Sequence, residues 1–296
     1  MDVKQLRFCE SIARLGSFTR AAEELHIAQP ALSIAIGKLE SELGVPLFFR
    51  HPRGVSTTPE GDIVIARASR IFQEMDSIRR ELDDASELKT GIVRIGLPPI
   101  FGLHYTPKLV TTFNAQHPGI QIAAIQGSAT RVGAMIDDGS IDLGIVEERR
   151  IDPAWVSQRI GQDEMVLALS AQHRLAARST VDPNDLAGLP MVVLTPDFLQ
   201  RQLLDAYCAE KEVEYKKVME CNFIQMTVLA AREGIGAVTL LRSFVASEPG
   251  LVALSFRPKM PFAFDFCWRR DRYLGKAAQA LVRFARPSKA STKTTG

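Results

Sequence analysis

The first sixty residues carry apolar positions at the spacing of short helices. Apolar residues recur at helical spacing through residues 6–13, and Gly16 stops the run. A second short helix follows Ser17, which suits an N-cap, and a third opens at Gln29 and Pro30. A turn of about three residues separates these two helices, so the pattern predicts a helix-turn-helix.

The third helix divides into a buried stripe and an outward face. Burying the apolar positions 32, 36, 39 and 43 turns Ser33 and Ile34 outward near its start. A recognition helix enters the major groove by its N-terminal residues, where Gln pairs with adenine, Ser pairs with several bases and Ile packs on a thymine methyl group. This pattern favours DNA recognition, and the alternative is a helical hairpin that packs on another domain.

A basic segment without acids follows this helix. Residues 45–58 contain Arg50 and Arg53, and Pro52 with Gly54 predicts a tight turn between two extended pieces. Such a two-stranded wing brings its basic tip to phosphates or the minor groove; the alternative is a solvated hairpin. The predicted DNA-binding residues are Ser17, Thr19, Arg20, Gln29, Pro30, Ser33, Ile34, Lys38, Arg50 and Arg53.

From residue 59 the apolar pattern becomes a heptad. Apolar residues return at alternating spacings of 4 and 3, while the other faces are charged. A strict 3.5-residue period favours a partner helix over an amphipathic helix lying on its own domain, and a DNA reader of this size needs a dimer to span two half-sites. A dimerisation helix is predicted, with its seam at Val64, Ala68, Ile71, Met75, Ile78 and Leu82.

After residue 90, short apolar strands alternate with amphipathic helices. This alternation predicts parallel sheets sandwiched by helices, with the polar residues 147–153 passing the chain to a second sheet. Strands are predicted at 92–97, 120–125, 143–146, 165–170, 191–194, 218–221, 236–240 and 263–269. Helices are predicted at 105–116, 129–138, 198–212, 223–233 and 274–286.

Composition and charge then limit the class of protein. With 46% hydrophobic and 24% charged residues, the 296-residue chain has the balance of a globular protein of about two domains. No apolar run reaches the roughly 18 residues of a membrane span, the first ten residues do not resemble a signal peptide, and four scattered cysteines fit a reducing cytosol. We therefore expect a cytoplasmic protein with no membrane partner. The net charge of +2 by itself does not indicate DNA binding.

Taken together, these segments resemble a LysR-type transcriptional regulator. The motifs that carry the resemblance are FTRAA (18–22), AQPALS (28–33), KLE (38–40), LFFR (47–50), TTPEG (57–61), GSIDLGI (139–145) and GIGAV (234–238). The resemblance implies an α/β fold overall, with an N-terminal winged helix-turn-helix, a long linker helix, and a periplasmic-binding-protein-like effector domain of two Rossmann-like lobes.

The resemblance also sets the expected domain boundaries. These are residues 1–58 for the winged helix-turn-helix, 59–90 for the linker helix, 91–286 for the effector domain and 287–296 for a disordered tail. Lobe I would take residues 91–161 and 268–286, and lobe II residues 162–267.

Several partners follow from the resemblance. They are double-stranded promoter DNA near the nucleoid, a small-molecule co-inducer between the lobes, further copies of the chain in a homotetramer, and RNA polymerase as a further candidate. One departure is that Ile34 and Ala35 stand where the family usually has polar residues. Base reading is then expected to depend on Gln29, Ser33, Lys38 and apolar contact.

The co-inducer is expected beyond the carboxyl ends of the strands, where helix N-termini offer N–H groups. Ser128 and Thr130 at a helix start suit a carboxylate, Arg131 adds positive charge, and phenylalanines supply an apolar wall. Glu147 is an unfavourable neighbour for an anion. A small organic acid is predicted to bind Pro99, Phe101, Ser128, Thr130, Arg131, Glu147, Thr195, Phe198, Phe223 and Ile224.

Other functions receive less support from the sequence. It contains no G-x-S-x-G elbow, P-loop or G-x-G-x-x-G after a strand, and its five histidines lack metal-ligand spacing, so no catalytic residue, metal or cofactor is expected. A solute-binding protein would share the lobes but not the first 88 residues. The closest alternative is a thiol-based redox-sensing regulator that uses Cys208 and Cys221.

Overall fold

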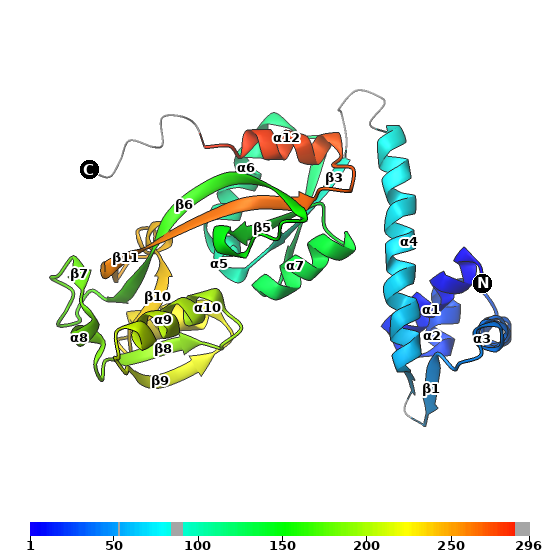
Figure 1. The fold of residues 1–296 in the computed structure, drawn as a ribbon, viewed down its shortest axis with the longest axis horizontal. Coiled ribbons are helices and arrows are strands. Elements are labelled where there is room, and N and C mark those ends of the chain that lie inside the picture. The colour runs from blue at the N-terminus through cyan, green and yellow to red at the C-terminus, as the bar shows by residue number, and fades with distance from the viewer. Residues whose placement is uncertain (53, 84–90, 288–296) are drawn as a thin grey trace. The chain divides into compact units, whose positions relative to one another are not determined.

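The computed structural model describes residues 1–52, 54–83 and 91–287, which form two compact units (Figure 1). The first unit comprises residues 1–85 and the second residues 86–296. Within the described residues, no helix combines the length and apolar character needed to cross a membrane.

The first unit is a winged helix-turn-helix followed by a long helix. Its elements are α1 (Val3–Leu15), α2 (Phe18–Glu24), α3 (Gln29–Leu43), β1 (Phe48–His51), β2 (Gly54–Thr57) and α4 (Pro59–Asp83). Gly16 ends α1 with a φ of 61°, and the Ser17 side chain caps α2, as the sequence pattern predicts. Strands β1 and β2 pair antiparallel and form the wing. Helices α1 to α3 bury one apolar core, at whose centre Ile12, Leu32 and Ile36 have no exposed surface.

Helix α4 has a different environment at each end. Ala68 is fully buried in a cluster with Leu6 and Phe72, and Val64 packs against the same cluster. The prediction that Ala68 faces a partner helix is therefore wrong, because α1 of the same unit covers it. Val64 is half-buried against the same cluster. The remaining seam residues are exposed, and they are Ile71, Met75, Ile78 and Leu82.

The second unit is built on one mixed sheet with the strand order β4-β3-β5-β11-β6-β10, and β7 pairs with β11. Its strands are β3 (Gly91–Leu97), β4 (Ile120–Gln126), β5 (Leu143–Glu147), β6 (Trp155–Ser170), β7 (Thr180–Val181), β8 (Pro190–Leu194), β9 (Lys216–Cys221), β10 (Val238–Leu241) and β11 (Leu251–Arg269). Its α-helices are α5 (Pro99–Leu103), α6 (Tyr105–Gln116), α7 (Ala129–Asp138), α8 (Pro183–Leu186), α9 (Leu199–Glu210), α10 (Ile224–Arg232), α11 (Arg242–Val245) and α12 (Lys276–Phe284).

Strands β6 and β11 run through both lobes of this unit (Figure 1). At one end of the pair, β5 joins β11 and extends the sheet through β3 and β4; at the other end, β10 joins β6. Strands β8 and β9 pair parallel beside the second end, where Met191 bridges to Ala237. The chain therefore crosses between lobes along these two strands.

Two expectations about the lobes are corrected by this pairing. Residues 264–267 of β11 pair with β5, so they belong to lobe I and not to lobe II, which was expected to extend to residue 267. The crossing also lies within β6 and not in the polar break at 147–153, because β6 begins at Trp155 in the first sheet. Both strands extend further toward their N-termini than the predicted 165–170 and 263–269.

Gly61 in the first turn of α4 fits against the loop before β1. A Cβ atom at this position would lie 2.1 Å from the Leu47 carbonyl oxygen, which is backbone. We expect Gly61→Ala to lower the free energy of unfolding by about 1–3 kcal/mol because the loop must shift. Gly37→Ala is the matched control, since nothing lies within 4 Å of a Cβ in that helix. It should stabilise by about 0.5–1 kcal/mol. Denaturant unfolding of the full chain measures both, and equal effects would contradict the close approach.

Candidate functional site

The outward face of α3 is available for base contacts. Leu32, Ile36 and Leu39 point into the core, which leaves Ile34 with 60% of its surface exposed. Pro30 and Lys38 are also exposed, while Gln29 and Ser33 are half-buried. An exposed isoleucine beside polar side chains fits the mixed apolar and hydrogen-bonding edges of a major groove.

The wing is attached to α3 by Arg50. Its Nη2 donates a hydrogen bond to Ser33 Oγ at 3.1 Å, and its guanidinium carbon lies 4.5 Å from the centre of the Phe18 ring. Phe18 in turn meets Phe48 edge-on, with ring centres 6.0 Å apart. Arg50 therefore connects the wing, the recognition helix and α2. Arg53 lies outside the described residues.

The other predicted contacts from α2 have structural partners. Ser17 Oγ accepts a hydrogen bond from the Arg20 backbone N–H at 3.3 Å, and the Arg20 guanidinium donates to the Leu15 carbonyl oxygen. Thr19 is exposed. Ser17 thus acts as a helix cap, while the Thr19 side chain remains open to solvent at the start of the helix.

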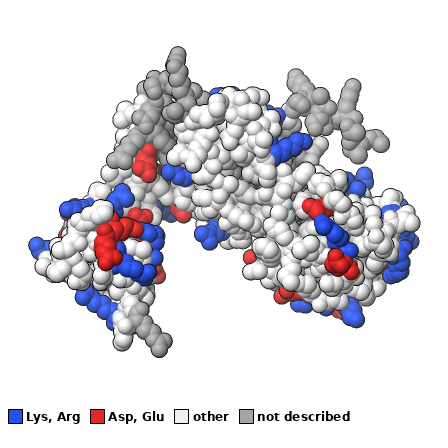
Figure 2. Space-filling view, turned by 180° about the vertical axis from the view of Figure 1, so that it is seen from behind, with Lys and Arg blue, Asp and Glu red and all other residues white. Residues whose placement is uncertain are grey.

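Charge on these surfaces is interspersed. In Figure 2 the basic and acidic side chains alternate over the face in view, with no region of one sign covering a whole unit. Residues 1–60 hold seven basic and seven acidic residues. The positions of individual cations, such as Lys38 and Arg50, must therefore carry any attraction to phosphate.

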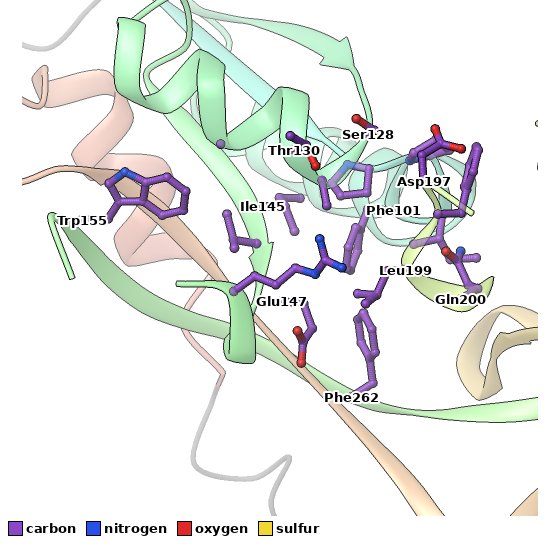
Figure 3. Close-up of a pocket in the computed structure, with 18 residues that line it drawn as sticks. Phe101, Ser128, Thr130, Ile145, Glu147, Trp155, Asp197, Leu199, Gln200 and Phe262 are labelled. Carbon is purple, nitrogen blue, oxygen red and sulfur yellow. The ribbon is translucent and has the colours of Figure 1, made fainter. Parts of the chain in front are cut away.

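A cavity of about 340 Å³ lies between the two lobes of the second unit (Figure 3). Lobe I contributes the carboxyl ends of β3 and β5 and the N-terminus of α7, and lobe II contributes the start of α9. The lining residues are Pro98, Pro99, Ile100, Phe101, Ser128, Ala129, Thr130, Gly133, Ile145, Val146, Glu147, Arg150, Trp155, Asp197, Phe198, Leu199, Gln200 and Phe262.

Six of the ten residues predicted to bind an effector line this cavity. They are Pro99, Phe101, Ser128, Thr130, Glu147 and Phe198.

The other four do not line it, for separate reasons. Ile224, the first residue of α10, is buried in the core, and Phe223 is 58% exposed outside the cavity. Thr195 Oγ1 is hydrogen-bonded to the Asp197 carboxylate, and Arg131 is an exposed residue of the first turn of α7.

Several lining residues were not predicted. Arg150 comes from the segment interpreted as a polar break. Trp155 and Phe262 come from the parts of β6 and β11 that were not predicted to be strand. Gln200 follows the predicted strand end at 194 and lies in the first turn of α9, so its position after a strand was the available signal.

The polar groups of the cavity are unevenly satisfied. The Gln200 side chain is almost completely buried, and its Nε2 has no hydrogen-bond partner. Ser128 Oγ caps α7 by accepting from the Arg131 N–H at 3.3 Å. Burial raises the pKa of Glu147, although the backbone and side chain of Arg149 partly offset it, with Arg149 Nε 3.8 Å from Glu147 Oε1. Among the described residues, no group of three His, Cys, Asp or Glu is placed to hold a metal ion.

Two family models match the two units described above. The model of the LysR substrate binding domain matches residues 86–290, and that of the bacterial regulatory helix-turn-helix protein, lysR family, matches residues 3–62. The chain belongs to the LysR family. It is therefore a DNA-binding transcriptional regulator of the LysR type with an effector-binding domain, and the family consists of regulators rather than enzymes.

Individual relatives of this LysR-family chain agree with that assignment. It is 30% identical over 287 residues to the uncharacterized HTH-type transcriptional regulator YwbI of Bacillus subtilis. The aligned region covers 95% of each chain. A full-length OxyR variant from Pseudomonas aeruginosa has a TM-score of 0.74 at 22% identity and covers 98% of this chain and 96% of its own. CbnR complexed with its target DNA has a TM-score of 0.72 at 16% identity, covering 96% and 99%. These two likenesses show the fold alone.

The cysteines of this LysR-family chain bear on the redox alternative. Burial raises the pKa of Cys208 to about 11, and that of Cys9 and Cys267 to about 12. A redox sensor needs a thiolate that solvent can reach, and Cys208 offers neither feature. Cys221 is half-buried, and its Sγ contacts the Phe223 carbonyl oxygen at 3.6 Å.

Alkylation tests this thiol chemistry. At pH 7.5 iodoacetamide should modify Cys221 well before Cys208 in the native protein, because Cys208 is buried and almost entirely protonated. Mass spectrometry over time measures the order, and Cys221→Ser is the control that removes the early adduct. Early labelling of Cys208, or loss of DNA binding after mild peroxide treatment, would favour a thiol switch.

The ionisation of Glu147 should appear in the pH dependence of stability. A carboxyl group whose folded-state pKa is raised favours folding below its unfolded pKa, and this contribution is lost as pH rises through the folded pKa. Glu147→Gln should therefore raise the unfolding midpoint at pH 7.5, and the gain should shrink toward pH 4. Glu214→Gln, which changes an exposed acid outside the cavity, should show no such trend. A gain independent of pH would contradict the burial of a charged carboxylate.

Proposed function

We propose that this chain is a transcriptional regulator whose promoter binding is modulated by a small organic acid held between its two lobes. The observation that carries the proposal is the cavity, since it lies where strand ends and a helix N-terminus meet in an α/β fold. The same chain carries a winged helix-turn-helix. Ligand-modulated promoter binding requires an effector-binding domain and a DNA-binding domain in the same protein.

An organic acid fits the donors and walls of the cavity. The first N–H groups of α7 are directed toward its N-terminal end, and Arg150 and the unpartnered Gln200 Nε2 supply further donors. Phe101 and Phe262, with ring centres 6.1 Å apart, and Phe198 supply apolar surface for the body of the ligand. Small-molecule sites commonly combine apolar walls with a few polar groups in this way.

For DNA we propose that the start of α3 enters the major groove. Gln29, Ser33, Ile34 and Lys38 would then contact base edges, and the wing would contact phosphates. The hydrogen bond from Arg50 to Ser33 supports this arrangement, because it connects the wing to the start of α3. Ser17, Thr19, Arg20 and Pro30 would lie close to the backbone of the same duplex.

For assembly we propose a homodimer through α4, with two dimers forming a tetramer. The row Ile71, Met75, Ile78 and Leu82 supports the dimer, because these apolar side chains remain exposed within the described residues of the unit. We place the protein in the cytoplasm at the nucleoid, with RNA polymerase as a further partner. Closure of the lobes on the acid would reorient the dimers and change the spacing or bend of the bound DNA.

A footprint across the promoter next to this gene tests the proposed function. Protection should extend over two half-sites, and one member of a panel of organic acids should change its extent or add a hypersensitive step. A chain that lacks residues 1–88 should lose the footprint and keep ligand binding. Footprints identical with and without an acid that binds the protein would contradict the regulatory role of that acid.

The dimer has its own test on α4. Ile78→Glu should weaken self-association by about tenfold or more, because a carboxylate would have to be buried against the partner helix. Ile63→Glu is the matched control, since Ile63 is equally exposed on another face of the same helix. Sedimentation velocity over a concentration series measures both. Equal effects, or none, would contradict pairing through this seam.

A further inference from the structure

The cavity lining has a charge balance that does not suit a simple anion. Among its eighteen residues, Glu147 and Asp197 are acidic and Arg150 is the one Lys or Arg side chain. With both acids ionised, the lining therefore has a net charge of −1. A plain carboxylate would gain attraction from Arg150 and from α7 but meet repulsion from Glu147 and from Asp197, which already accepts from Thr195 Oγ1.

Glu147 cannot turn away from a ligand easily. It is the last residue of β5, pairs with Phe264 of β11, and has only 7% of its surface exposed. Its cationic neighbour Arg149 is mostly exposed, and their 3.8 Å separation is long for an ion pair. A carboxylate can accept about four hydrogen bonds, so Glu147 retains capacity for a donor from the cavity.

Gln200, in contrast to Glu147, needs a hydrogen-bond acceptor. Its Nε2 is a donor without a partner, and its side chain is 96% removed from solvent (4% exposed) in the cavity wall. A buried donor left unsatisfied is unfavourable, so a ligand acceptor that reaches Nε2 would be favoured. A ligand that satisfies both Gln200 and Glu147 must therefore carry a hydrogen-bond acceptor and a hydrogen-bond donor.

The donors at the start of α7 and the Glu147 carboxylate lie at separate places in the cavity. In Figure 3, Ser128 and Thr130 stand at one end of the cavity, Glu147 lies on the other side beside Phe262, and Phe101 stands between them. A ligand whose acceptor lies at the N-terminus of α7 would therefore present its far end to Glu147. The phenylalanine between the two ends favours an apolar middle.

We infer that the effector is a monocarboxylate that carries a hydrogen-bond donor, either a hydroxyl or an ammonium group, on the end that reaches Glu147. This inference rests on the proposed function, which supplies the carboxylate. The carboxylate accepts from the N-terminus of α7 and from Gln200, while the donor satisfies Glu147. Dicarboxylates of the same length are disfavoured by repulsion at Glu147.

Two matched series of probes test the inference with the full chain. The aromatic series is benzoate, 4-hydroxybenzoate, 4-(aminomethyl)benzoate and terephthalate; the aliphatic series is butyrate, 4-hydroxybutyrate, 4-aminobutyrate and succinate. Isothermal titration should show, in the series that fits, that a donor-bearing acid binds about tenfold more tightly than the plain acid. The dicarboxylate should bind most weakly. The hydroxyl and ammonium members distinguish the two kinds of donor.

Three variants assign the effect to named side chains. Glu147→Gln should remove the advantage of the ammonium member and improve binding of the dicarboxylate, whereas Glu147→Asp should keep the order of the wild type. Gln200→Met should weaken all members that bind, by about tenfold. Glu214→Gln, outside the cavity, should leave every affinity unchanged. Thermal unfolding of each variant confirms that it is folded.

The outcomes distinguish failure of the donor-bearing ligand from failure of the proposed organic-acid effector. If the plain acids or dicarboxylates bind as tightly as the donor-bearing acids, and Glu147→Gln changes no preference, the inference is overturned while an acid effector stands. If no member of either series binds the wild type, or if Gln200→Met leaves all affinities unchanged, the assignment of an organic acid to this cavity is itself contradicted.

Discussion

The pairing of β6 with β11 is the interaction on which the sensing unit depends. In the middle of the pair, where residues 162–164 of β6 face residues 261–263 of β11, the described strands pair with each other and with no third strand. Toward each end, a further strand joins and a lobe begins. This strand pair therefore runs from one lobe into the other, and the cavity lies beside it.

The same strand pair forms part of the cavity wall. Phe262 lines the cavity, and two residues later Phe264 packs on Phe101 with ring centres 4.7 Å apart. Gly161 opposite Phe264 leaves room for this ring, since a Cβ there would lie 2.3 Å from its Cζ. Phe101 thus ties the cavity to the strands that cross between lobes. A ligand that pulls the lobes together would act on this contact.

Much of the fold could be predicted because its signals are local. Gly16, Ser17, Gly44 and Thr58 mark helix ends through their own backbone or side-chain bonds, and the structure places each at such an end. The long strands were harder to predict, because Gln162, Asp163 and Glu164 interrupt any apolar alternation in β6. Only pairing with β11 identifies this polar stretch as strand.

The residues of the cavity also divide into those with a local sequence signal and those without one. Ser128 and Phe101 were found because strand ends and helix starts locate ligands in α/β folds, whereas Arg150, Trp155 and Phe262 reach the cavity only through tertiary contacts. The heptad of α4 had the correct period, but the period could not show that α1 covers Ala68. Sequence periodicity identifies an apolar face; it does not identify which neighbour covers that face.

Hydrogen exchange of the full chain, with and without the tightest-binding acid, shows whether the effector binds between the two lobes. Amides in both lobes should become protected together, in the segments 100–101, 128–133, 145–150 and 198–200 that surround the cavity. Protection confined to one lobe, or located away from these segments, would contradict an effector site between the lobes.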